Sequence, residues 1–228
     1  MPNQIIKQYF EFLKLSGLQH LFFSAEKFDV KAEKHECRMD KSKEEILAAL
    51  AKQYNDCDRC DLAQTRKNVV YGNGCADAKM MVIGEGPGQE EDISGKPFVG
   101  RAGQLLTKML NAIDIEREEV YITNVVKCRP PNNRNPQILE IKSCLPYLEE
   151  QIEVIDPKLI LLLGRVACDA LIGGADTLKR YRQNKLEYLG IPVFATYHPS
   201  ALLRTPKWKR EAWEDLKVVK NVYDNIEE

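Results

Sequence analysis

The chain has 228 residues, of which 44% are hydrophobic and 29% charged, and this composition is typical of a globular protein with one core and an extension. The formal net charge of −1 gives no overall indication of a nucleic-acid partner. No apolar run is long enough to cross a bilayer, and charged residues interrupt the apolar N-terminus, so we expect neither a membrane span nor a signal peptide. These features predict a cytoplasmic protein, in which disulfides are rare.

Residues 1–45 are expected to form an extension that precedes a main domain over residues 46–228. Apolar residues at helical spacing near the N-terminus predict a short amphipathic helix, and the charged stretch after it predicts a solvated connector. Ser42 and Glu45 form a capping-box pattern, which predicts the start of a helix that leads to residues 57–60.

Strand-like apolar runs and helical stretches alternate through the rest of the chain. The strands are expected at residues 80–85, 120–126, 159–164 and 192–198, and the helices at 101–112, 137–154, 165–172 and 207–224. This order predicts an α/β fold with a parallel sheet that helices cover on both faces. Ligands of such sheets bind at the carboxyl ends of the strands, so we expect the site there.

Four of the seven cysteines have spacings that suit a metal centre. Cys57 and Cys60 form a C-x-x-C pair, and Cys128 and Cys144 follow at wider spacing. Four thiolates can hold a zinc ion or an iron–sulfur cluster, and the spacing leaves both open. The alternative is a chance pair plus two buried core cysteines. The other cysteines have no partner at useful spacing: Cys37, Cys75 and Cys168, the last expected in the core.

A glycine-rich segment, GEGPGQEED at residues 84–92, follows the first predicted strand. Its glycines allow the backbone to approach a ligand closely, and Glu85 lies at the strand end, where it can act on a bound group. The third glycine of a dinucleotide fingerprint and the Lys-Ser/Thr of a phosphate loop are both missing, which argues against those sites. The alternative is a plain turn with solvated acids at Glu90 and Asp92.

Asn124 lies within the second predicted strand, and His198 closes the fourth. An amide carries donors and an acceptor, so it can read one edge of a nucleobase, and asparagine is disfavoured within strands. A single histidine is more often structural than catalytic, but the position of His198 at the expected site favours a role in chemistry.

Two basic segments without acidic residues lie at the same edge, at residues 125–136 and 198–210. Basic side chains neutralise DNA phosphates, and apolar side chains in a basic loop can wedge into a base stack. The segments therefore favour nucleic-acid binding over two merely solvated loops. Their basic and apolar members are Lys127, Arg129, Arg134, Arg204, Lys207, Lys209, Arg210, Leu202, Leu203 and Trp208.

Four segments in order, GEGPGQEED, GKPFVGRAGQLL, TNVVKCRPPNNRNP and YHPSALLR, resemble those of family 4 of the uracil-DNA glycosylases, the iron–sulfur type. The resemblance covers about residues 50–222 and says nothing of the extension. It implies a three-layer α/β/α fold around a four-stranded parallel sheet. It also implies a DNA repair enzyme, expected to be a monomer, that flips uracil out of single- or double-stranded DNA, hydrolyses its N-glycosidic bond and leaves an abasic site.

The resemblance also implies a structural [4Fe–4S] cluster on Cys57, Cys60, Cys128 and Cys144. The implied catalytic residues are Glu85, His198 and Glu91; the substrate-binding residues are Gly86, Phe98 and Asn124; and the DNA-binding residues are Ser200, Leu202, Leu203, Arg204, Arg129 and Arg134.

Each implied role follows from the chemistry of base release. Phe98 would stack on the flipped uracil, and Asn124 would read its N3–H and O4 edge. His198 would donate a hydrogen bond to O2 as charge builds there. Glu85 would position the water, and Glu91 would assist it or shape the pocket. Either Leu202 or Leu203 would fill the gap left in the duplex.

Two departures from related glycosylases limit the expectations. Gly86 and Pro87 stand where better-known enzymes carry a tyrosine that excludes thymine, so thymine must be excluded in another way. A related branch has an inserted loop whose histidine traps the base covalently, and SGKPFVGRAGQLL contains no such insert, which argues against a covalent mode. The alternatives to catalysis are a DNA- or partner-binding module that keeps the fold and cluster, and an electron-transfer protein.

Overall fold

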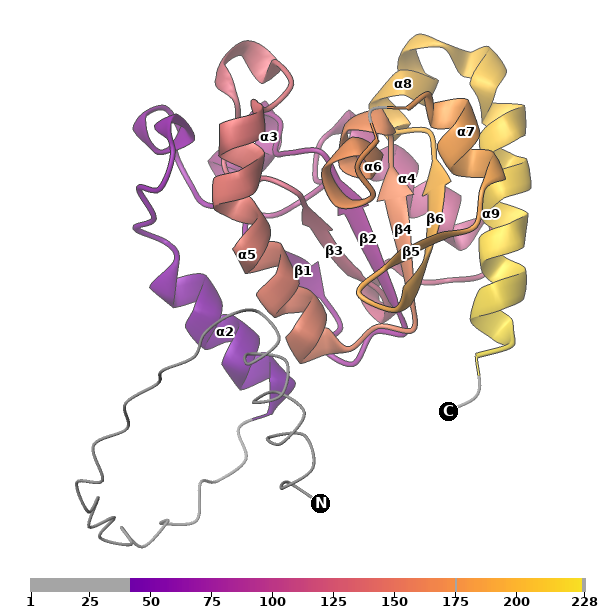
Figure 1. The fold of residues 1–228 in the computed structure, drawn as a ribbon, viewed down its shortest axis with the longest axis horizontal. Helices are drawn as coiled ribbons and strands as arrows, with labels where there is room; N and C mark the ends of the chain where they lie inside the picture. Colours follow the sequence, from indigo (N-terminus) through magenta and orange to yellow (C-terminus); the bar gives the residue numbers. More distant parts are fainter. Residues whose placement is uncertain (1–41, 175, 227–228) are drawn as a thin grey trace, which may run out of the picture. The chain divides into compact units, whose positions relative to one another are not determined.

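A six-stranded mixed sheet is the central layer of the computed structural model, which describes residues 42–174 and 176–226 (Figure 1). The strands lie in the order β1-β3-β2-β4-β6-β5. They are β1 (Asn73–Gly74), β2 (Met80–Gly84), β3 (Tyr121–Asn124), β4 (Leu159–Leu163), β5 (Leu186–Tyr188) and β6 (Ile191–Thr196). The helix and connector predicted before Ser42 lie outside the described residues.

The four inner strands are parallel, which confirms the predicted four-stranded core of the sheet. Strands β2 and β4 are buried at every position, and this explains why their sequences show no polar alternation. The two edge strands were not predicted: β1 runs antiparallel to β3, and β5 runs antiparallel to β6. With two and three residues, they are too short for a period-two pattern to be recognised.

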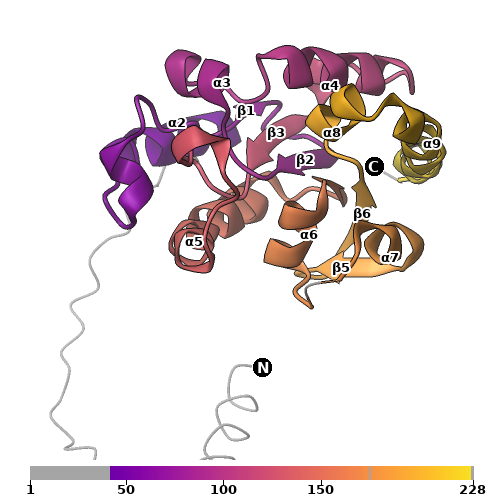
Figure 2. The same cartoon turned by 90° about the horizontal axis from the view of Figure 1, so that it is seen from above.

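Helices cover both faces of the sheet, as predicted for an α/β/α fold (Figure 2). The five helices predicted within the described residues are present, and the capping box of Ser42 and Glu45 starts the first. Three helices of six residues were missed, because segments this short carry little periodic signal. The helices are α2 (Lys43–Gln53), α3 (Gln89–Ser94), α4 (Arg101–Asn111), α5 (Ile138–Ile155), α6 (Arg165–Leu171), α7 (Leu178–Gln183), α8 (Pro199–Arg204) and α9 (Lys209–Asp224).

Side chains that alternate along the inner strands supply two separate hydrophobic cores. Met81 and Ile83 pack on one face with residues of α2, α5 and α6, whereas Met80 and Val82 pack on the other with residues of α4, α8 and α9. Each inner strand therefore contributes to both cores, which is the packing expected of a parallel sheet with two covered faces. None of the helices in the described part of the chain is long and apolar enough to cross a membrane.

The strand register brings the predicted site residues to one edge of the sheet. Gly84 at the end of β2 lies opposite Asn124 at the end of β3. Gly164 directly follows β4, and His198 follows β6 by two residues. Because these strands are parallel, their carboxyl ends meet at the same edge, where such sheets bind ligands.

Helix α4 packs tightly against the segment that precedes it, and this predicts a large cost for one added methyl group. A Cβ at Gly103 would overlap the backbone carbonyl of Phe98. We expect Gly103→Ala to lower the free energy of unfolding by about 1–3 kcal/mol, as overpacking does, and to lower the midpoint of thermal unfolding. Lys108→Ala on the same helix, at an exposed position, serves as the control. Equal stability of the two variants would contradict the packing described here.

Candidate active site and cysteine-lined cavity

A cleft of about 690 Å³ opens at the carboxyl ends of the inner strands. It brings together nine of the twelve catalytic, substrate-binding and DNA-binding residues that the resemblance implies: Glu85, Gly86, Glu91, Phe98, Asn124, Arg134, His198, Ser200 and Arg204. Three others are not among its lining residues: Arg129, Leu202 and Leu203. The cleft is therefore built by segments that follow β2, β3, β4 and β6, far apart in the sequence.

Asn124 presents an unpaired polar atom to this cleft. Its side chain is 1% exposed, and its Oδ1 has no hydrogen-bond partner among the described residues. A buried acceptor without a partner costs about 1–3 kcal/mol, so native structures rarely retain one without a functional reason. Because Asn124 lines the cleft, a ligand with a suitably placed N–H group can supply the missing hydrogen bond.

Phe98 lies close to this amide because Gly84 has no side chain. A Cβ at Gly84 would come within 2.5 Å of both the Asn124 Oδ1 and the Phe98 ring. The Phe98 ring centroid is also 5.6 Å from that of His198, with the planes inclined by 35°. An aromatic surface, an amide and an imidazole thus converge from three different segments.

The Phe98 backbone is held from both sides by side-chain hydrogen bonds. Its φ of 51° lies in the left-handed region, which is strained for a residue with a bulky side chain. Glu91 Oε1 accepts the N–H groups of Val99 and Gly100, both at 2.9 Å, while its Oε2 accepts the N–H of Gly88 at 3.1 Å. From the other side, Arg117 donates to the Pro97 carbonyl at 2.9 Å.

These contacts change how two residues are interpreted. Both carboxylate oxygens of Glu91 are engaged by backbone amides, an arrangement that favours shaping the pocket over proton transfer. Arg117 was not singled out in the sequence. It lies just before β3, far from the glycine-rich segment, and no local pattern indicates that it reaches the Pro97 carbonyl.

His198 is fixed in one tautomer at the start of helix α8. Its Nδ1 accepts the backbone N–H of Ser200 at 3.2 Å and lies 2.8 Å from the Ser200 Oγ. Burial, together with the Arg204 charge, lowers the pKa of His198 to about 4, while the Glu91 charge opposes the shift. The ring is therefore neutral near pH 7, with its hydrogen on Nε2, and Nε2 can act only as a donor.

Glu85 directly follows β2 and lines the cleft with its carboxylate. Burial raises its pKa, while the charges of Arg165 and Arg204 lower it. Within the described residues, no hydrogen bond or ion pair engages its side chain. The carboxylate is thus available to accept a hydrogen bond from a water molecule.

The structure distinguishes the two leucines proposed to enter DNA. Leu202 is 1% exposed and belongs to the hydrophobic core, whereas Leu203 is 37% exposed. Leu202 cannot fill a gap in a duplex without leaving the core, so its burial argues against that role. Leu203 is the candidate that remains.

The first basic segment is less available to DNA than its composition suggested. Lys127 is 1% exposed and cannot contact a phosphate, which corrects its interpretation as a surface cation. Arg134 binds both oxygens of Glu140, at 2.8 and 2.6 Å, and Arg129 donates to Asn133 Oδ1 at 2.8 Å. A two-point contact of this kind holds the Arg134 guanidinium, although the residue still lines the cleft.

The Lys127 side chain instead joins β3 to helix α5 through buried hydrogen bonds. Its Nζ donates to Thr123 Oγ1 at 2.6 Å, to the Asn124 carbonyl at 2.9 Å and to Gln151 Oε1 on α5 at 2.5 Å. Burial lowers the pKa of Lys127 to about 7, and the charge of Cys144 opposes the shift. This network links Asn124 to helix α5, the helix that also carries Cys144.

Asp92 is also more constrained than expected. It is buried rather than solvated, and its Oδ1 accepts the backbone N–H groups of Lys67 and Asn68, at 2.8 and 3.3 Å. The expectation of a solvated acid was wrong at this position, because a carboxylate that caps backbone amides is stable in the interior. Asp92 thereby joins α3 to the segment that precedes β1.

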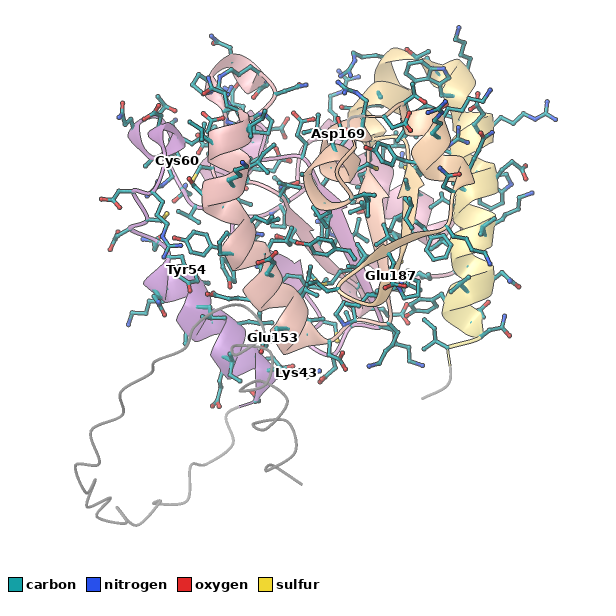
Figure 3. All side chains as sticks on the ribbon, in the orientation of Figure 1. Lys43, Tyr54, Cys60, Glu153, Asp169 and Glu187 are labelled. Carbon is teal, nitrogen blue, oxygen red and sulfur yellow. The ribbon has the colours of Figure 1, made fainter. Side chains whose placement is uncertain are left out.

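The four predicted metal ligands line one cavity beside helix α5. Cys57, Cys60, Cys128 and Cys144 surround it together with aromatic and basic side chains. Figure 3 labels Cys60 near this helix. Cys168 is buried in the core, as predicted, and Cys37 lies outside the described residues.

Hydrogen-bond donors already face these thiols. The backbone N–H of Lys127 donates to Cys144 Sγ at 3.2 Å, Arg66 reaches Cys128 Sγ at 3.7 Å, and Cys57 Sγ lies 3.2 Å from the Tyr147 hydroxyl. Burial, together with the neighbouring thiols, raises the pKa of Cys128 to about 12, while the charge of Arg66 opposes the shift. Bound metal removes this penalty because it stabilises thiolates directly. In the described part of the chain, no three His, Cys, Asp or Glu side chains form a site for a single metal ion.

Comparison with known proteins agrees with the geometry. Residues 71–217 match the family model of the uracil DNA glycosylase superfamily. A type-4 uracil-DNA glycosylase of Thermotoga maritima is 43% identical over 79% of this chain and 96% of its own length. A type-4 enzyme of Saccharolobus solfataricus is 46% identical over 76% of this chain and 85% of its own length. A type-5 enzyme of Pyrobaculum aerophilum is 33% identical over 57% of this chain and 64% of its own length.

The match to the superfamily model spans most of the described domain. Of these relatives, the two that are more than 40% identical to this chain, over most of their own length, are both type-4 enzymes. The chain therefore belongs to the uracil DNA glycosylase superfamily and, within it, to the type-4 uracil-DNA glycosylases.

Proposed function

We propose that this protein hydrolyses the N-glycosidic bond of uracil in DNA and leaves an abasic site. The unpaired Oδ1 of Asn124, placed beside the Phe98 ring in the cleft, carries the proposal. The membership of the chain in a family of uracil-DNA glycosylases supports it. A base inside a duplex is inaccessible to such a cleft, so the uracil must first be flipped out.

Base recognition would use the amide and the ring together. The Asn124 Oδ1 accepts the N3–H of uracil, which supplies the hydrogen bond that the buried oxygen lacks. Cytosine presents a lone pair at N3, so the same acceptor repels it. Phe98 stacks on the face of the base. The hydrogen bonds of Glu91 and Arg117 to the backbone on either side of Phe98 hold the ring in place.

Bond cleavage would use His198 and Glu85. Uracil leaves as an anion, and the Nε2–H of neutral His198 can donate to its O2 as negative charge develops. The sugar becomes oxocarbenium-like, and the Glu85 carboxylate can orient water toward C1′ while opposing the positive charge. Glu91 and Ser200 act as positioning residues, one for Phe98 and one for the tautomer of His198.

We also propose that Cys57, Cys60, Cys128 and Cys144 hold a [4Fe–4S] cluster. The four residues line one cavity, and N–H groups face its sulfur atoms, as around other thiolate-bound clusters. Bound there, the group would link the loop after α2, the end of β3 and helix α5. A set of four cysteine ligands leaves no open position for substrate, so its contribution would be structural.

Uracil-containing DNA, single- or double-stranded, is the proposed substrate. The exposed cations Arg204, Lys207, Lys209 and Arg210 support contact with its phosphates, and Leu203, which is exposed, would enter the duplex. The monomeric state and the cytoplasmic location expected from the sequence stay predictions.

The proposal is tested by incubating the protein with a uracil-containing oligonucleotide, without added divalent metal. We expect free uracil and an abasic product, and we expect Asn124→Ala and His198→Ala each to slow release by about 100- to 1,000-fold. Lys108→Ala, on an exposed helix face, should retain the parental rate. DNA binding without any uracil release would instead favour a non-catalytic binding module.

The pH dependence of kcat/KM should report Glu85 rather than His198. Burial holds the Glu85 pKa above its usual range, so its carboxylate is lost as the pH falls through that raised value, and the rate falls with it. His198, with a pKa of about 4, stays neutral between about pH 5 and 8 and adds no step near its ordinary value.

Two variants test which residue causes the fall of kcat/KM at low pH, the acid limb of the profile. Glu85→Gln should be slow and lack the limb, whereas His198→Gln should be slow and retain it. An acid limb that disappears in His198→Gln and persists in Glu85→Gln would reverse the two assignments.

Loss of one proposed cysteine ligand should disturb Asn124, the residue proposed to recognise uracil. In Cys128→Ala we expect loss of absorbance near roughly 400 nm, where iron–sulfur clusters absorb, together with a parallel fall in DNA affinity and uracil release. Cys168→Ala, at a buried cysteine outside the cavity, should keep all three. If Cys128→Ala keeps its affinity and activity, the cavity does not anchor the end of β3.

A further inference from the structure

The cleft extends beyond the residues assigned to uracil. Its lining also includes Val166 on α6, Leu178 on α7, Tyr197 after β6, and Trp208 at the end of the short helix Pro206–Trp208. All four side chains are partly exposed. We call this part the aromatic wing. A volume of about 690 Å³ suits a ligand well beyond one pyrimidine ring, so the base pocket leaves the wing available.

The aromatic wing is built around a rigid stack. The rings of Tyr197 and Trp208 lie 5.2 Å apart with an interplanar angle of 17°. The Arg182 guanidinium lies over the Tyr197 ring, 4.6 Å from its centroid, and donates to the Tyr197 hydroxyl at 3.1 Å. Tyr197 in turn donates to Glu211 Oε2 at 2.7 Å. The ring that supports Trp208 is therefore fixed on several sides.

Arg182 is itself held by acids of α9. It makes a two-point contact with Asp215, at 2.7 and 3.0 Å, and a third contact with Glu211 at 2.6 Å. Asp215 also accepts the hydroxyl of Thr196 from β6 at 2.8 Å. Strand β6, helix α7 and helix α9 thus hold the stack in advance, which reduces the entropy lost when a planar ligand binds.

Unpaired cations border the wing. Arg204 lines the same cleft, and Lys207, Lys209 and Arg210 follow within the next six residues. All four are exposed, and none of their side chains makes a hydrogen bond or ion pair with another described residue. Aromatic rings next to free cations are the combination that proteins use to bind single-stranded nucleic acid.

We propose that the aromatic wing binds a second nucleobase, the unpaired neighbour of the flipped uracil on the same DNA strand. Trp208 stacks on this base with Tyr197 behind it, and the bordering cations contact the phosphates of the strand. The site accepts any base, because stacking uses the ring face and reads no edge. This inference rests on the proposed function, since it places the strand by its uracil.

The charge of the border decides between a nucleotide and an apolar peptide. Arg204 lines the cleft beside the wing, and a purely apolar segment would leave its guanidinium without a partner of opposite charge, whereas Arg165 in the same lining is already paired with Asp169 at 2.9 Å. A nucleotide supplies a ring for Trp208 and an anion for the cations at the same time. The wing is also continuous with the base pocket, so one strand can occupy both.

The experiment uses the intrinsic fluorescence of Trp208. The chain contains two tryptophans, and Trp213 lies on α9 outside the cleft lining. Trp213→Phe therefore leaves Trp208 as the only tryptophan. The probes are single-stranded oligonucleotides with one 2′-fluoro-2′-deoxyuridine, whose glycosidic bond resists cleavage. The residue on its 5′ or 3′ side carries either adenine or no base.

We expect adenine on one side to quench Trp208 and to tighten binding by about 5- to 150-fold relative to the base-free probe. In Trp208→Ala, adenine and base-free probes should bind equally. Trp208→Phe, which keeps an aromatic face, should recover part of the difference. Thermal unfolding of each variant establishes that the fold is intact.

Three results would overturn the proposal. They are equal binding of both probes on either side of the uracil, a difference that persists in Trp208→Ala, and failure to bind the single-stranded probes while duplex DNA is processed. Uracil release from a duplex by Trp213→Phe is measured in parallel. Its absence would contradict the proposed function, whereas its presence without any effect of the neighbouring base would contradict only the second site.

Discussion

The buried ammonium of Lys127 is the contact on which the rest of the site depends. Removing a cation from water is costly, and three oxygen acceptors at 2.5–2.9 Å offset this cost only while β3 and α5 keep their positions. One acceptor is the carbonyl of Asn124, and the backbone N–H of Lys127 faces the sulfur of Cys144. The amide in the cleft and the cysteine-lined cavity are therefore two ends of a single buried network.

The other groups of the cleft are held in a similar way, by hydrogen bonds to the backbone. Glu91 and Arg117 fix the segment around Phe98, and Ser200 fixes the ring of His198. The groups that would meet the base are thus positioned before any ligand arrives. The side chains of Arg204, Lys207, Lys209 and Arg210, in contrast, are exposed and unpaired among the described residues. Rigid recognition at the centre and adaptable charge at the border suit a small base attached to a long polyanion.

The sequence predicted the inner strands and the edge at which the site lies, because both follow from local apolar runs and from the geometry of parallel sheets. It failed where a side chain's environment depends on distant partners. Lys127 was taken for a surface cation because composition does not reveal the oxygens beneath β3. Leu202 and Leu203 are adjacent and chemically identical, and only packing separates the buried one from the exposed one. Arg117 carries no local signal for its contact with the Pro97 carbonyl.

The missing side chain of Gly84 restricts how this pocket can evolve. Any residue larger than glycine there would meet the Asn124 amide and the Phe98 ring together. A new base preference cannot arise at this position through one substitution, because the aromatic residue or the amide would have to change in the same step. Such coupling makes the floor of the pocket strongly epistatic. Adaptive change in this lineage should accumulate first along the outer walls of the cleft, where one residue can vary without displacing another.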